Sequence, residues 1–151
     1  MSPLLTEADP ARPLDGADTS SRRRWAGRVL SGIAVLFLTF DVVIKLVRAA
    51  PAIQGTVELG FAPHHVLTIG LIGLVCLILY VIPRTAPLGA VLWTGYFGGA
   101  IAVQLRLDEP LFSHILTPIY IAVLVWGGLY LRDERVRALF HDARQPLPRN
   151  I

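Results

Sequence analysis

The sequence predicts an all-α fold, an integral membrane four-helix bundle, from two observations. The first is length: a bilayer core is about 30 Å thick and a helix rises about 1.5 Å per residue, so about 20 apolar residues span it. Four apolar runs of about this length follow one another, at residues 25–47, 64–82, 86–107 and 112–131. The second is composition, because 54% of the 151 residues are hydrophobic and the mean hydropathy is +0.57, values typical of membrane proteins.

The spanning segments are predicted to be helices rather than strands. Lipid offers no hydrogen-bond partners to the backbone, so only helices and closed barrels cross a membrane. A barrel strand alternates apolar and polar residues, whereas residues 66–82 are almost continuously apolar. The single cysteine, Cys76, lies in this run, which excludes a disulfide or a paired-thiol redox centre within one chain.

The segment before the first run, residues 1–24, is predicted to be a disordered cytoplasmic tail. It is rich in Pro, Asp, Ser and Ala, has no periodic apolar pattern and ends in three arginines. A basic cluster before an apolar run also occurs in signal peptides. This run is longer than the usual apolar part of a signal peptide, about 7–15 residues. It also contains Asp41 and Lys45, so we expect it to be retained as the first span.

Basic residues are distributed unevenly between the two predicted sides of the membrane. One side holds Arg22, Arg23, Arg24, Arg28, Arg84, Arg132, Arg135 and Arg137. The other side holds only Lys45, Arg48 and Arg106. Because cytoplasmic flanks carry the excess of Lys and Arg, both termini are predicted to be cytoplasmic. Contact with the lipid bilayer thus explains the net charge of +3, and no nucleic-acid partner is expected.

The connections between the runs are predicted to be turns and loops. Residues 83–87 contain two prolines and are expected to form a tight cytoplasmic turn. The longest connection, residues 49–63, is expected to be an outer loop, and Pro110 to lie in the outer turn after the third run. These connections alternate between the two sides, as four consecutive spans require.

The segment after the fourth run is predicted to be an amphipathic cytoplasmic tail, residues 136–151. Within residues 132–144 a helix would place Val136, Leu139 and Phe140 on one face among charged residues. Such a helix suits the surface of an anionic leaflet. A solvated helix end is the alternative interpretation.

Two charged residues inside the first run require an explanation. Asp41 and Lys45 stand four residues apart, so on a helix they share one face and can pair. A charge in the membrane costs about 2.5–3.5 kcal/mol on insertion scales, so the carboxylate must be paired, protonated or hydrated. Three interpretations stay open: an ion pair that stabilises the bundle, a carboxylate that binds a proton or ligand in an outer cavity, or a contact between subunits.

More polar residues fall in the outer halves of the predicted helices. Gln104 and Arg106 lie near the end of the third run, and His114 lies near the start of the fourth. With Asp41 and Lys45, they are the candidate ligand-binding residues of an outward-facing polar pocket. The alternative is an interfacial rim, because the ends of membrane helices are polar in any case.

No catalytic or metal-binding motif is recognised. His64 and His65 are adjacent, and their side chains diverge by about 100° on a helix, a poor spacing for chelation, so no metal site is predicted. Nucleotide-binding loops, nucleophile elbows and haem-attachment motifs are absent from the sequence. The sequence therefore favours a non-enzymatic role, and catalytic residues are not assigned.

Small residues in the third run predict close helix packing. Gly95 and Gly99 are four residues apart, and small residues at this spacing let helix backbones approach closely. We expect this face to pack inside the bundle, with a homo-oligomer interface as the alternative. Pro118 is expected to kink the fourth helix. Tyr80 and Trp93 are expected to anchor span ends at the membrane interface.

Several ordered stretches resemble the DoxX-like family of small bacterial membrane proteins. They are residues 40–46, residues 79–86, Gly89 with residues 94–100, and residues 126–133. The resemblance extends over about residues 25–135 and implies a four-helix protein of the bacterial inner membrane. The family name derives from a subunit linked to quinone and sulfur-compound oxidation. The resemblance therefore implies a quinone as candidate cofactor and a soluble redox protein as candidate partner.

One position departs from the family pattern. A histidine often stands in the family where this chain has Gln104. If that histidine relays protons or binds metal in the family, Gln104 cannot do so here, because an amide side chain does not titrate.

Three functions follow from these observations. The first is a non-catalytic subunit or anchor of a membrane redox or stress-response assembly. The second is binding or transport of a small molecule or lipid through the outer pocket. The third is a quinone-reactive enzyme that acts by itself.

Overall fold

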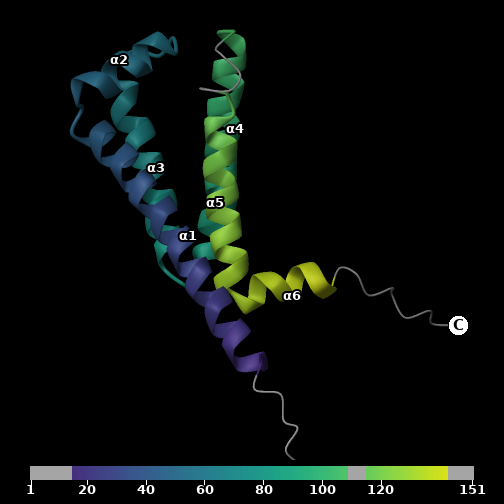
Figure 1. Ribbon diagram of the computed structural model, residues 1–151. Helices are drawn as coiled ribbons and strands as arrows, with labels where there is room; N and C mark the ends of the chain where they lie inside the picture. Colours follow the sequence, from purple (N-terminus) through teal and green to yellow (C-terminus); the bar gives the residue numbers. More distant parts are fainter. Residues whose placement is uncertain (1–14, 109–114, 143–151) are drawn as a thin grey trace, which may run out of the picture.

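The computed structural model describes residues 15–108 and 115–142, which form six helices and no strand. The helices are α1 (Asp15–Leu46), α2 (Ala50–Glu58), α3 (His65–Val81), α4 (Ala86–Arg106), α5 (Thr117–Arg132) and α6 (Glu134–Asp142). Helices α1, α3, α4 and α5 pack as a ring in which both α1 and α4 contact α3 and α5 (Figure 1). The all-α class is therefore confirmed. The turn predicted at Pro110 and the candidate residue His114 lie outside the described residues.

The four predicted runs correspond to α1, α3, α4 and α5. By length and composition, α1 and α4 can each cross a membrane. Helices α3 and α5 are shorter apolar helices of 17 and 16 residues. Large apolar side chains are exposed around the ring, for example Leu36 and Phe40 on α1, Val75 on α3, Val91 on α4 and Val123 on α5. Water would not stabilise such a surface, whereas lipid would.

Two segments predicted to lack regular structure are helical. Helix α1 begins at Asp15, so residues 15–24 of the predicted tail belong to it. Arginine has a high helix propensity, and Arg24 Nη2 lies 2.7 Å from Glu134 Oε1, so the basic cluster extends the helix rather than ending it. The predicted loop at residues 49–63 contains α2, in which Pro51 lies in the first turn, where a backbone amide has no helical partner.

The kink that the sequence predicted at Pro118 does not occur. Helix α5 begins at Thr117, so this proline lies in the first turn and removes no helical hydrogen bond. The predicted turn at residues 83–87 is short, because α3 ends at Val81 and α4 begins at Ala86. The Thr85 hydroxyl donates a 2.8 Å hydrogen bond to the Leu79 carbonyl and thereby ties the turn to α3.

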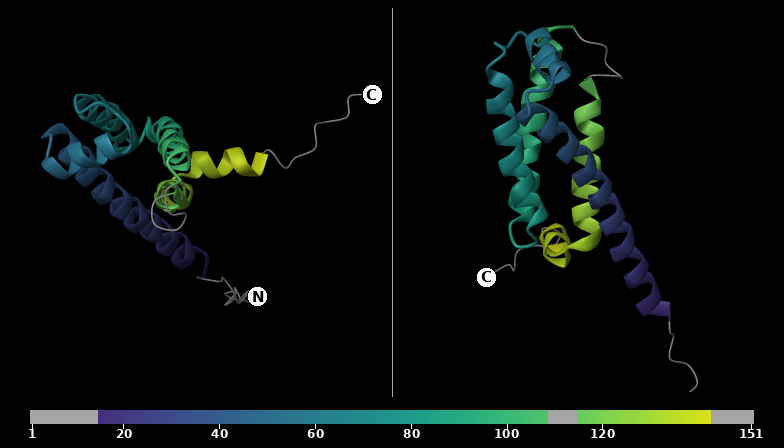
Figure 2. Two further views of the ribbon diagram at one scale, coloured as in Figure 1. Left: turned by 90° about the horizontal axis from the view of Figure 1, so that it is seen from above. Right: turned by 90° about the vertical axis from the view of Figure 1, so that its left-hand side faces the viewer.

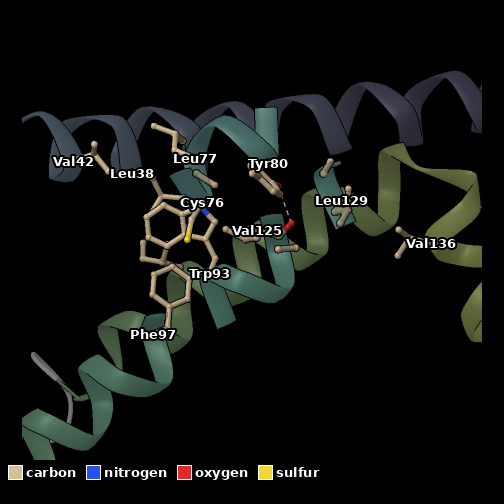
Figure 3. Packing of buried hydrophobic residues seen from close by; sticks show 14 residues of the cluster. Leu38, Val42, Cys76, Leu77, Tyr80, Trp93, Phe97, Val125, Leu129 and Val136 are labelled. Carbon is tan, nitrogen blue, oxygen red and sulfur yellow. Dashed lines mark hydrogen bonds between the residues drawn. The ribbon is translucent and has the colours of Figure 1, made fainter. Parts of the chain in front are cut away.

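The core contains two aromatic residues that were expected at the membrane interface. Tyr80 and Trp93 both have no exposed surface (Figure 3). The Tyr80 hydroxyl donates a 2.9 Å hydrogen bond to the Val125 carbonyl, so α3 is linked to α5 inside the ring. A buried hydroxyl needs such a partner, and this one explains why a tyrosine near a helix end lies in the core.

Close helix contacts occur at glycines other than those predicted. A Cβ atom on Gly89 would lie 2.6 Å from Tyr80 Cα, and one on Gly128 would lie 2.7 Å from the Ser31 amide nitrogen. By contrast, a Cβ on Gly95 or Gly99 would meet nothing within 4 Å. The predicted packing of Gly95 and Gly99 inside the bundle is therefore wrong for this chain. Helix α4 approaches another helix most closely at Gly89, in its first turn, and not at Gly95 or Gly99.

Candidate functional site

The pair α1 and α3 diverges from the pair α4 and α5 (Figures 1 and 2). Residues of both pairs line a cavity of about 530 Å³. A Cβ on Gly70 would lie 2.9 Å from Lys45 Cβ, so α3 and α1 remain in close contact here. The divergence therefore separates two pairs of helices rather than four single ones. The lining residues are Phe37, Leu38, Asp41, Lys45, Thr56, Leu59, Phe61, Ile69, Ile72, Trp93, Gly95, Tyr96, Phe97, Gly99, Ala100, Val103, Gln104, Thr117, Pro118 and Ile121.

The α1 wall carries the charged pair of the cavity. Lys45 Nζ donates a 2.6 Å hydrogen bond to Asp41 Oδ1 and also contacts Oδ2. The exposed fraction of the side chain is 19% for Lys45 and 30% for Asp41. The carboxylate is thus the more accessible member, and the two opposite charges cancel. The predicted pairing on one helical face is present in the structure.

The α4 wall is aromatic. Trp93, Tyr96 and Phe97 stand three and four residues apart, so they share one helix face. The Trp93 ring is stacked at 5.2 Å between centroids on Phe97 and meets Tyr96 edge to face at 5.0 Å. Lys45 Nζ lies 6.0 Å from the centroid of the Tyr96 ring, so the ammonium lies between the carboxylate and this aromatic group.

Gln104 provides the second polar group of the cavity. Its Oε1 atom is buried and has no hydrogen-bond partner among the described residues. A buried acceptor without a partner costs about 1–3 kcal/mol. A hydrogen bond from a bound molecule to this atom would therefore contribute more to binding than a hydrogen bond to a solvated group.

The structure brings together three of the five candidate residues. Asp41, Lys45 and Gln104 all line the cavity. Arg106 is exposed and does not line it, and its Nη2 would lie 3.1 Å from a Cβ on Gly60, against the connection between α2 and α3. His114 lies outside the described residues.

Sequence analysis missed the aromatic wall and the contribution of α2. The spacing of Trp93, Tyr96 and Phe97 was available as a signal, because three aromatic residues on one helix face predict a shared surface. Thr56 is buried on α2 and lines the cavity, and its hydroxyl donates a 2.7 Å hydrogen bond to the Ala52 carbonyl, so it has no donor left for a ligand. No sequence signal placed this residue, because its segment was expected to be a loop.

The cavity has the chemistry of a binding site. Sites for small molecules are mostly apolar, measure about 300–1,000 Å³ and contain a few polar groups that orient the ligand. Within the described residues, no group of three or more His, Cys, Asp or Glu could hold a metal ion. Cys76 lies in the buried core cluster and does not line the cavity.

Comparison with known proteins identifies the family. A family model matches residues 29–128, which include every cavity-lining residue. The chain belongs to the DoxX-like family. Searches of curated proteins and of solved structures found no match. DoxX-like membership together with the apolar helices suggests a membrane protein, and the resemblance drawn from the sequence is confirmed.

Proposed function

We propose that this DoxX-like protein binds a small amphipathic molecule in the cavity between its two helix pairs. One observation carries the proposal: a cavity of about 530 Å³ with an aromatic wall contains a charge-balanced pair, Asp41 and Lys45. The apolar body of a ligand would contact the rings of α4, and its polar group would reach the pair. Because the charges of the pair cancel, the site favours a ligand without net charge.

The polar group of the ligand is best a hydrogen-bond donor. The Asp41 carboxylate is the more accessible member of the pair, and Gln104 Oε1 has no partner among the described residues. Both atoms accept hydrogen bonds, so an uncharged donor such as a hydroxyl suits them. Trp93 Nε1, on another lining residue, is a buried donor without a partner in the described part of the chain. A quinol hydroxyl can both donate and accept, so it can serve all three atoms, whereas the oxygens of the oxidised quinone only accept. These residues would hold and orient such a ring.

The proposed location is a bacterial inner membrane, with both termini in the cytoplasm. Arginines separated widely in the sequence support this orientation. Arg28, Arg84 and Arg132 line one recess at the end of the molecule opposite the cavity. Because positive residues concentrate on the cytoplasmic side, the cavity would lie in the outer half of the membrane.

A second candidate function is a non-catalytic subunit or anchor of a membrane redox or stress-response assembly. The observation that favours it is α6, which extends sideways from the helix ring (Figure 1) and leaves Leu139 70% exposed. A soluble partner could dock on this helix. Affinity purification of the full chain from its native membrane tests this candidate: a stoichiometric soluble partner supports it, and one lost on deletion of α6 supports this docking surface.

The cavity proposal is tested by filling the cavity. Gly99 lines the cavity and Gly98 does not, and a Cβ on either would meet nothing within 4 Å. Gly99→Leu should therefore enter the cavity without distorting α4, and Gly98→Leu is the matched control. Binding of a short-chain hydroquinone is measured by quenching of tryptophan fluorescence, since Trp93 lies in the wall.

We expect the control to bind like the parent and Gly99→Leu to lose binding. Equal binding by both variants, or no binding by the parent to hydroquinone or to molecules extracted from its native membrane, would refute the proposal. Oligomeric state is measured on the same samples. A dimer in the parent that Gly99→Leu dissociates would instead support the homo-oligomer interface through Gly95 and Gly99.

A further inference from the structure

A second recess, of about 510 Å³, lies at the opposite end from the cavity. It forms where α1, the turn between α3 and α4, and the junction of α5 with α6 meet. Its lining residues are Arg28, Pro83, Arg84, Ala86, Leu129, Arg132, Asp133, Glu134 and Arg135. Four arginines from four separate segments therefore face one space.

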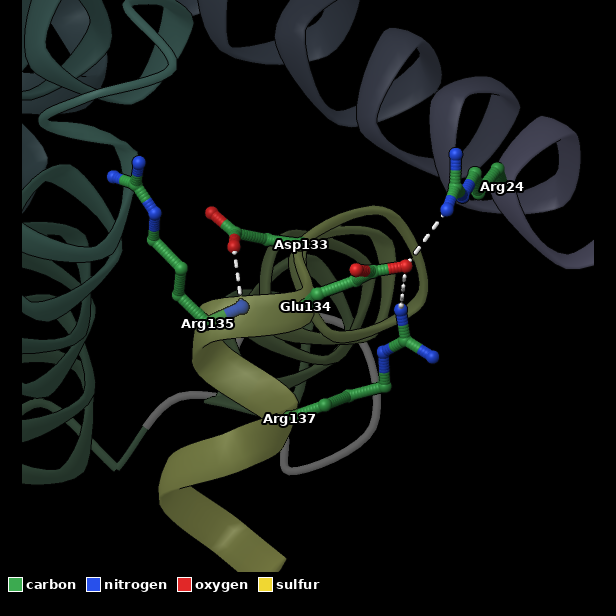
Figure 4. A network of polar contacts seen from close by, with 5 residues as sticks. All are labelled: Arg24, Asp133, Glu134, Arg135 and Arg137. Atoms are coloured by element: carbon green, nitrogen blue, oxygen red, sulfur yellow. Dashed lines mark hydrogen bonds and ion pairs between the residues drawn. The ribbon is translucent and has the colours of Figure 1, made fainter. Parts of the chain in front are cut away.

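The two acidic residues of the recess already have partners (Figure 4). Glu134 Oε1 lies 2.7 Å from Arg24 Nη2 and 3.5 Å from Arg137 Nη2. Asp133 Oδ1 accepts a 2.9 Å hydrogen bond from the Arg135 backbone amide. Glu134 is paired with arginines that do not line the recess, and Asp133 is paired with no guanidinium. The four arginines of the recess therefore outnumber its carboxylates, and its net charge is positive.

The arginines of the recess differ in what they contact. The Arg132 guanidinium lies 5.1 Å from the centroid of the Tyr80 ring and donates a 3.4 Å hydrogen bond to the Tyr80 carbonyl, so the core holds it in place. Arg28, Arg84 and Arg135 are exposed and form no ion pair within the described part of the chain. The recess therefore has an excess of positive charge and several guanidinium donors.

We propose that this recess binds the phosphate headgroup of an anionic phospholipid. Guanidinium groups bind phosphate oxygens by paired, charge-assisted hydrogen bonds, and basic pockets between membrane helices on the cytoplasmic side suit anionic headgroups. The proposal uses the placement of the helices in a membrane and is independent of any ligand in the outer cavity.

The surroundings of the recess favour a lipid over a free phosphate. Val81 and Ile82, directly before the lining residue Pro83, are apolar and exposed, and acyl chains can lie against them. Trp25 is 68% exposed one residue after Arg24, as expected for an aromatic side chain at headgroup level. Val136 anchors α6 in the core while Leu139 is exposed, so α6 can lie along the membrane surface beside the recess.

The test uses arginines that line the recess without holding the fold. Arg84→Gln and Arg135→Gln remove unpaired guanidinium groups, and Arg23→Gln removes an exposed arginine on α1 that does not line the recess. The full chain is purified in neutral detergent. Binding of phosphatidylglycerol, and separately of phosphatidylcholine, is measured by native mass spectrometry. Circular dichroism checks that each variant keeps its helix content. If one of the two recess variants unfolds, binding is compared for the other one.

We expect phosphatidylglycerol to bind more tightly than phosphatidylcholine. Arg84→Gln and Arg135→Gln should each lower the affinity for phosphatidylglycerol about fivefold, and the double variant about 25-fold. Arg23→Gln should change this affinity little. Millimolar inorganic phosphate should not displace the lipid. Three results would overturn the proposal: no preference for phosphatidylglycerol, an equal loss in Arg23→Gln, or full displacement by inorganic phosphate, which would assign the recess to a free anion.

Discussion

Gly89 and Gly98 both lie on α4. The structure predicts that alanine at Gly89 lowers the free energy of unfolding, whereas alanine at Gly98 does not. A Cβ on Gly89 would lie 2.6 Å from Tyr80 Cα and 2.8 Å from the Leu79 carbonyl carbon, both of which are backbone atoms of α3. Backbone atoms cannot rotate away as side chains do. Helix α3 would therefore have to move by roughly 0.5–1 Å, and overpacking of this kind costs about 1–3 kcal/mol.

Gly98 has no such neighbour. A Cβ there would meet nothing within 4 Å, so alanine adds no clash. Glycine in a helix interior is less favourable than alanine by about 0.8–1.0 kcal/mol. Gly98→Ala should thus leave stability unchanged or raise it by up to about 1 kcal/mol. The two variants are expected to differ in free energy of unfolding by about 1–4 kcal/mol.

Unfolding is measured by titrating a denaturing detergent into neutral micelles and following far-UV circular dichroism. Gly89→Ala should unfold at a clearly lower fraction of denaturing detergent than the parent, and Gly98→Ala at the same fraction or a higher one. If the two variants unfold at the same fraction of denaturing detergent, or if Gly98→Ala is the less stable one, α4 does not pack against α3 through Gly89. The arrangement of the helix pairs, and with it the cavity, would then be wrong.

Three further predictions concern the core, the charged pair and the orientation. Tyr80→Phe should lower the free energy of unfolding by about 1 kcal/mol in the same titration, because the hydrogen bond to the α5 backbone is lost while the ring still fills its place. Asp41→Asn and Lys45→Met should each destabilise more than the double variant, because each single change leaves a lone charge near the cavity; additive effects would argue against the pair. A reporter that is active only in the periplasm, fused after Asn150, should be silent, and strong activity would reverse the proposed orientation.

Properties set by neighbours along one helix could be predicted from the sequence. Asp41 and Lys45 pair because they are four residues apart, and this relation holds on any straight helix. The apolar runs became helices for a similar reason, since lipid or a packed core requires each segment to satisfy its own backbone. Helix ends were less accurate: the polar composition of residues 15–24 indicated disorder, whereas the structure continues α1 through them and places Arg24 beside Glu134.

Properties that depend on which helix faces which could not be predicted in this way. The pair Gly95 and Gly99 has the spacing typical of close packing, yet the contacts occur at Gly89 and Gly128, which no spacing pattern distinguishes. A glycine permits a close approach but does not choose the partner. The buried position of Tyr80 likewise depends on a carbonyl of α5 that lies 45 residues away in the sequence.

The cavity results from the positions of the closely packed and the uncovered glycines along the helices. Gly89 and Gly128 bring helices together near the turn between α3 and α4, whereas Gly95 and Gly99 form a wall that no other helix covers. Helices held closely at one end and not at the other diverge, and the space between them must be filled by side chains, lipid or a ligand. Because the side chains of this chain leave about 530 Å³ of that space open beside Asp41, the polar pair faces whatever fills it.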